Sequence, residues 1–177
     1  AVTGLLRNLR AEVVLTAAPS DYLSDHEATS ALVRDACFAS SIPNYVTPAQ
    51  GPALARIPHL YFMDPIDQKD RSGCPTVPDF TIDVTSTFEM KLRMLGKHRS
   101  QRAWLQQQHG TDDYLRQKEE WTRARGARAG VGFGEGFRNY TVPPYPHQPL
   151  HQQTLADYLC AAGSPSSAPG AGEVQIK

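Results

Sequence analysis

The sequence lacks several features that would assign it to a class of protein at once. No stretch approaches the roughly 18 consecutive apolar residues of a membrane-spanning helix, and no charged-then-apolar signal peptide opens the chain. Basic and acidic residues balance at 18 each, so overall charge favours neither nucleic acid nor a membrane surface as a partner. These absences predict a cytoplasmic protein with no nucleic-acid or membrane partner.

Cysteine is also scarce. The three cysteines, Cys37, Cys74 and Cys160, are widely spaced and odd in number, which excludes a disulfide framework and a Cys-x-x-Cys metal site. There is no Walker loop and no Gly-x-Ser-x-Gly elbow. The glycine-rich stretch 130–137 lacks the spacing of a dinucleotide fingerprint, so we expect a loop there.

What the chain does contain is ordinary globular composition. Its 177 residues are 40% hydrophobic and 20% charged, enough for one domain with a core and too few for two. We expect residues 1–160 to form a single domain. Residues 161–177 are rich in Gly, Ser, Pro and Ala, cannot bury much apolar area, and are predicted to be a disordered tail.

The hydrophobic pattern predicts an α/β fold. A helical pattern through Leu5, Leu6 and Leu9 precedes an apolar run over 11–17, which is typical of a strand buried on both faces of a parallel sheet. A helical pattern over 28–39 follows, and this alternation favours layered α/β architecture. Because the pattern opens on a helix, an earlier strand is missing. Further along we predict strands at 59–63 and 80–84 and helices at 86–108, 112–126 and 150–160.

The turn at residues 21–27 is the densest concentration of functional side chains. Asp21, Asp25 and His26 follow the end of the first predicted strand, where ligands bind in open α/β sheets. One interpretation is structural, because Ser24 and Glu27 have the spacing of a helix capping box. The other is a zinc site, in which His26 is a ligand and a neighbouring carboxylate fixes its tautomer. The residues alone leave both open.

Two further groups have similar alternatives. Asp64, Asp67 and Asp70 follow the second predicted strand; they are either a solvated acidic loop or a site for a divalent metal or sugar hydroxyls, although a calcium loop would need a central Gly and a terminal Glu. Residues 86–129 carry ten basic and five acidic side chains. This basic segment, with His98 and Arg99, is either a solvated helix face or an anion- or polyol-binding surface.

The order of these motifs resembles the LmbE-like / PIG-L family of zinc-dependent de-N-acetylases. The segment 21–29, after the strand at 13–16, is similar to the family's second metal motif, which usually reads His-Pro-Asp-His before a helix. The similarity continues through 34–38, 57–61, 97–101 and 134–138, and covers roughly residues 5–140.

This resemblance implies a Rossmann-like three-layer α/β/α fold, one Zn²⁺, and removal of an N-acetyl group from an N-acetylglucosamine-type or related small molecule. His26 is implied as a zinc ligand, with Asp25 as the neighbouring catalytic carboxylate. The implied substrate-binding residues are Asp21, Asp64, His98, Arg99 and Glu135.

The chain departs from the family pattern in two places. Position 23 is Leu where the family usually has a histidine, and the family's first motif, Ala-His-Pro-Asp-Asp, is absent. That motif supplies two zinc ligands and the general base. We therefore expect residues 1–177 to be the C-terminal portion of a longer enzyme, inactive alone. The alternative is a non-catalytic relative that binds a glycan or a partner, and a homo-oligomer is compatible with either.

Overall fold

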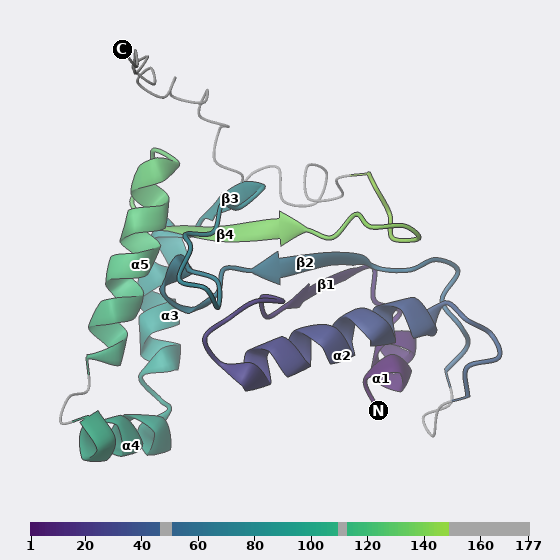
Figure 1. The fold of residues 1–177 in the computed structure, drawn as a ribbon, viewed down its shortest axis with the longest axis horizontal. Helices are drawn as coiled ribbons and strands as arrows, with labels where there is room; N and C mark the ends of the chain where they lie inside the picture. The colour runs from purple at the N-terminus through teal and green to yellow at the C-terminus, as the bar shows by residue number, and fades with distance from the viewer. Residues whose placement is uncertain (47–50, 110–112, 149–177) are drawn as a thin grey trace, which may run out of the picture.

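A computed structural model describes residues 1–46, 51–109 and 113–148 (Figure 1). The predicted α/β class is confirmed. The predicted helix at 150–160 and the predicted tail at 161–177 lie outside the described residues. In chain order the elements are α1 (Val2–Leu9), β1 (Val13–Thr16), α2 (Ser24–Ser40), β2 (His59–Met63), the 3₁₀ turn η1 (Ile66–Gln68), β3 (Phe80–Asp83), the 3₁₀ turn η2 (Thr85–Thr87), α3 (Phe88–Leu95), α4 (Arg99–His109), α5 (Tyr114–Arg128) and β4 (Gly134–Asn139).

The sheet is mixed, which corrects the parallel sheet expected from the sequence. Its strand order is β1-β2-β4-β3, with β1 and β2 parallel and both pairs that involve β4 antiparallel. The stretch predicted to be a glycine-rich loop is largely the strand β4. Glycine has low strand propensity, but here it allows close contacts: a Cβ at Gly134 would lie 3.0 Å from the Gly126 Cα, and one at Gly136 would lie 2.9 Å from the Pro78 Cβ.

β1 forms one edge of the described sheet. The run at 11–17 was expected to be buried on both faces, but Leu15 is 51% exposed. The prediction is wrong in this respect because no strand among the described residues lies on the outer side of β1. The bounds of β1 and β2 nonetheless agree with the sequence pattern.

The helices form two groups (Figure 1). α1 and α2 pack on each other, and α2 contacts β1 and β2, whereas α3 and α5 pack together near β3 and β4, with α4 beyond them. The single long helix predicted at 86–108 is interrupted between Leu95 and Arg99. Gly96 explains the interruption, because glycine is a weak helix former and a Cβ there would approach Leu115 of α5 to 3.7 Å.

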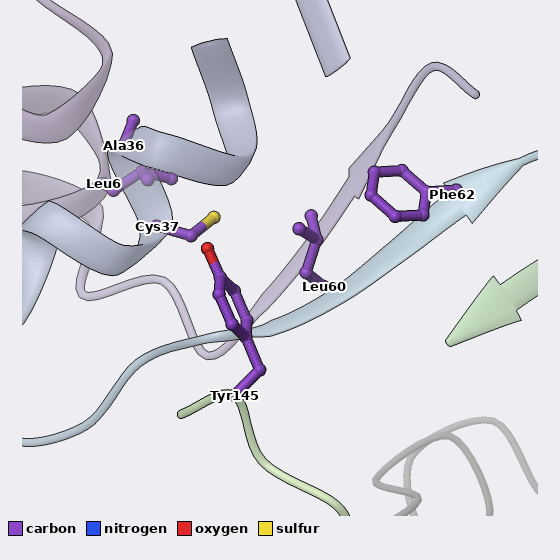
Figure 2. Close-up of a cluster of buried hydrophobic side chains, with 6 residues drawn as sticks. All are labelled: Leu6, Ala36, Cys37, Leu60, Phe62 and Tyr145. Atoms are coloured by element: carbon purple, nitrogen blue, oxygen red, sulfur yellow. The ribbon is translucent and has the colours of Figure 1, made fainter. Parts of the chain in front are cut away.

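A small apolar core joins the first group of helices to the sheet (Figure 2). Its buried members come from α1, α2, β2 and the segment after β4: Leu6, Ala36, Cys37, Leu60, Phe62 and Tyr145. The Tyr145 hydroxyl points toward the α2 residue Cys37 in Figure 2 and donates a hydrogen bond to the Arg34 carbonyl. Burial raises the pKa of the Cys37 thiol to about 12, so this thiol stays protonated and structural.

Arg7 fixes α1 against the end of α2. The side chain is 4% exposed and donates to the carbonyls of Ser40 at 3.1 Å, Ala39 at 3.2 Å, Ile42 at 2.6 Å and Tyr45 at 2.9 Å. These are carbonyls at and beyond the C-terminus of α2, which lack helical partners. A cation is favourable there because the helix dipole is negative at its C-terminus.

Candidate functional site

Asp21 organises the loop between β1 and α2. Its carboxylate is 2% exposed; Oδ1 accepts from the Leu23 N–H at 3.0 Å, and Oδ2 accepts from the Ile66 N–H at 3.2 Å. Oδ2 also lies 3.0 Å from Nδ1 of His26. The loop after β1 is therefore joined to the turn after β2 through one buried carboxylate.

The contact between Asp21 and His26 defines the tautomer of the imidazole. A carboxylate oxygen accepts, so the proton of a neutral ring lies on Nδ1 and the lone pair lies on Nε2. His26 is 37% exposed on its side chain, so its ring is accessible from solvent. A carboxylate behind a histidine is the usual arrangement around a metal-binding or basic imidazole.

The predicted capping box does not form. The N-cap of α2 is Leu23, which makes no side-chain cap hydrogen bond. Glu27 instead accepts from the Asp21 N–H at 3.0 Å and pairs with Arg71. The Glu27 carboxylate closes the loop before the helix, which explains why it does not reach back to Ser24.

Asp25 differs from Asp21 in its surroundings. Its side chain is exposed, and Oδ1 accepts from the His26 backbone N–H at 3.1 Å. The carboxylate that contacts the His26 ring is thus Asp21 and not its sequence neighbour Asp25. A catalytic role for Asp25 stays a prediction.

Asp64 lies on the next strand end and is paired with a buried arginine. Nε of Arg125 lies 2.8 Å from Asp64 Oδ2, and the guanidinium is 3% exposed. Arg125 also donates to the Thr76 carbonyl at 3.3 Å. Oδ1 of Asp64 is buried and has no partner among the described residues, so this oxygen can accept a hydrogen bond from a bound hydroxyl or water.

Glu135 lies in a second charged group. It pairs with Lys91 of α3, and half-buried Lys118 of α5 lies close enough for both charges to act on its amine. Burial, followed by the Lys91 charge, lowers the pKa of Lys118 to about 8. This amine is therefore able to exchange a proton near neutral pH, which an ordinary lysine is not.

Three of the predicted residues lie along one edge of the sheet. Asp21 bonds the backbone of Ile66, two residues beyond Asp64, and the Asp64 N–H bonds the carbonyl of Gly136, next to Glu135. This is the carboxyl end of β1 and β2, where ligands bind in such folds. We call Asp21, His26, Asp64, Arg125 and Glu135 the carboxyl-edge cluster.

His98 and Arg99 are not part of the cluster in this structure. Both are exposed, at the junction of α3 and α4, and their hydrogen bonds among the described residues are made by the backbone. Their proposed substrate contacts stay a prediction.

Sequence reasoning missed Arg125, Lys91 and Lys118. The excess of positive charge in 86–129 was noted, yet nothing in it separates a buried arginine from solvated ones. A weak signal exists in α5, because Lys118, Trp121 and Arg125 recur at helical spacing on one face.

A catalytic zinc takes three protein ligands and keeps one position open. Among the residues that the structure describes, no three His, Cys, Asp or Glu side chains gather around one point. The described residues therefore supply His26 as one suitable ligand and do not make a complete site. In the same part of the chain, no helix is long and apolar enough to cross a membrane.

Solved structures with a similar fold include two enzymes. They are the 4-carboxy-2-hydroxymuconate hydratase GalB from Pseudomonas putida KT2440 (19% identity, 84% of this chain and 60% of that chain, TM-score 0.57) and the N,N'-diacetylchitobiose deacetylase from Pyrococcus horikoshii with its inhibitor MPG (23%, 78% and 49%, 0.59). A third is the conserved protein TT1542 from Thermus thermophilus (22%, 82% and 60%, 0.60). No protein-family model matches the sequence.

The chain has an LmbE-like fold. This agrees with the fold that the sequence resemblance implied. The chain spans from 49% to 60% of the length of these solved chains. At such identities the likeness establishes the LmbE-like fold, and the roles of individual residues rest on the geometry above.

Proposed function

We propose that the whole protein is a hydrolase that removes an N-acetyl group from an amino-sugar-like small molecule. The observation that carries this proposal is the pairing of His26 with buried Asp21 at the carboxyl edge of an LmbE-like sheet. It fixes an imidazole with its Nε2 lone pair free, which suits metal binding. A deacetylase among the structural neighbours supports the reaction class.

In this proposal His26 is one ligand of a zinc ion whose other ligands lie outside the described residues. Zinc bound there would supply an activated water, because it lowers the pKa of bound water to about 7. The chain's own contribution is orientation. Asp21 holds the His26 ring, and Arg125 holds Asp64 so that its free Oδ1 faces a substrate hydroxyl.

Metal content tests the ligand role independently of activity. We expect the whole protein to bind one zinc per chain, His26→Ala to lose most of it, and Asp25→Ala to keep it. Asp21→Asn is expected to weaken zinc binding roughly 10- to 100-fold, as outer-shell carboxylates usually do. Unchanged zinc stoichiometry in His26→Ala would remove His26 from the site.

The reaction class needs its own test, because one neighbour is a hydratase. Hydration and amide hydrolysis both add water to an electrophilic carbon. We expect release of free amine from N-acetylglucosamine or N,N'-diacetylchitobiose and no loss of the ultraviolet absorbance of an unsaturated hydroxy acid. The reverse result would replace the hydrolase proposal by a hydratase. The 177-residue chain alone is expected to be inactive.

Leu23 favours a second candidate, a binding protein without catalysis. It occupies the N-cap of α2 where the resemblance would have a histidine, so the imidazole that would polarise the acetyl group is absent. If the zinc-loaded whole protein binds the sugar without releasing acetate, and Leu23→His does not confer turnover, the binding function is favoured.

A further inference from the structure

A pocket of about 300 Å³ lies at the opposite end of the sheet from the carboxyl-edge cluster. It is lined by residues 10–12 and 52–59 together with Arg7. Glu12 immediately precedes β1, and His59 is the first residue of β2, so the pocket is at the amino ends of the two parallel strands. None of the proposed hydrolase residues lines it.

The rim of the pocket has an excess of positive charge. Arg10 and Arg56 are exposed and form no ion pair in the described part of the chain, and Glu12 is the acidic residue of the lining. Arg7 is already occupied by four backbone carbonyls. Two guanidinium groups are therefore left for a ligand.

His59 supplies an independent indication of a ligand. It lines the pocket and is 9% exposed, yet its Nδ1 is buried without a hydrogen-bond partner among the described residues. A buried polar atom without a partner is costly and uncommon. Burial and then the nearby Arg56 lower the pKa of His59, so the ring is neutral and can donate from one nitrogen.

The wall of the pocket is apolar and firmly attached. Pro52, Leu54 and Ile57 line it. The Leu54 N–H bonds the Ser40 carbonyl at 2.9 Å, and the His59 N–H bonds the Glu12 carbonyl at 2.9 Å. Gly51 approaches α1 so closely that a Cβ there would lie 2.7 Å from Asn8 Oδ1. A wall fixed at several points is pre-organised for binding.

We propose that this pocket binds a small organic anion with a compact apolar body. Arg10 and Arg56 pair with its acidic group, His59 hydrogen-bonds an acceptor that reaches the floor, and the apolar wall covers the remainder. The volume is at the lower limit of known ligand pockets, roughly 300–1,000 Å³, which excludes large cofactors. The guanidinium groups suit a carboxylate or a phosphate, since both accept planar paired hydrogen bonds.

Titration of the 177-residue chain with hexanoate tests the proposal. We expect saturable binding, seen as shifts in the NMR signals of the His59 ring and of the amides of residues 52–58. The matched neutral probe, 1-hexanol, should bind about ten-fold more weakly because it lacks the charge that pairs with arginine. Inorganic phosphate, as a third probe, separates a phosphate site from a carboxylate site.

Two variants and one control locate the binding. Arg56→Gln and Arg10→Gln are each expected to weaken hexanoate binding about ten-fold, whereas Arg128→Gln, an exposed arginine on α5, should leave it unchanged. Because Arg10 and Arg56 are exposed, both variants should fold. No saturable shift with either anion, or equal weakening in Arg128→Gln, would overturn the proposal.

Discussion

At the carboxyl end of β1 and β2, Asp21 and Asp64 are buried and hold partners on distant segments. At the amino end, Arg10 and Arg56 are exposed and unpaired within the described residues. The first arrangement stabilises the fold and orients a site, because removing one member leaves a buried group without its partner. The second contributes little to stability and leaves its charge available to a ligand. Substitutions at the two ends should therefore have different effects.

The largest effect is expected for Arg125→Ala. This change leaves the Asp64 carboxylate, which is 15% exposed, without its cation, and loss of one partner of a buried pair costs about 3–5 kcal/mol of the free energy of unfolding. Urea denaturation followed by circular dichroism measures it. The matched control is Arg128→Ala, three residues further along α5 and exposed. A loss no greater than that of the control would show that the pair is not structural.

Asp21→Ala should have the next largest effect on stability. The Leu23 and Ile66 amides would lose their acceptor, and orphaned buried donors cost about 1–3 kcal/mol. Asp25→Ala, four residues later and exposed, should change the free energy of unfolding by less than about 0.5 kcal/mol. Equal losses in the two variants would contradict the assignment of Asp21 as the carboxylate that holds the loop.

These two pairs also show how far the sequence leads. The bounds of β2 were predictable because His59–Met63 is a continuous apolar run between turn residues. β4 was not, because Gly134 and Gly136 are justified by close contacts with α5 and with the Pro78 and Asp64 side chains, and such contacts have no sequence period. His26 and Asp21 were candidates because they share one turn. Arg125 was not a candidate, because 61 residues separate it from Asp64.

The charged group at Lys118 predicts a pH dependence. Its pKa in the folded protein is about 8 against an ordinary 10.5, so between pH 8 and 10.5 the unfolded state binds more protons, and the free energy of unfolding rises with pH. Below pH 8 both states are protonated and this contribution is absent. Wild type should gain roughly 1–2 kcal/mol relative to Lys118→Met from pH 7 to pH 10. Denaturation at both pH values measures the difference, in which groups common to both proteins cancel.

A falling or constant difference between the two proteins would contradict the burial of the Lys118 amine. Lys97→Met is the matched comparison, since Lys97 is an exposed lysine near the same helices. That variant should follow wild type across the pH range. The comparison thus separates the buried amine from general effects of removing a positive charge.

The smallest stability effect is expected for Arg56→Gln at the amino end. Arg56 is exposed and forms no ion pair within the described residues, so its loss should change the free energy of unfolding by less than about 0.5 kcal/mol. Removing its charge should instead raise the pKa of His59, because Arg56 is one of the causes that lower it. NMR titration of the His59 ring measures this shift, with Arg128→Gln as the control. A large loss of stability in Arg56→Gln would mean that this guanidinium is structural, like that of Arg125, and would remove the contrast between the two ends of the sheet.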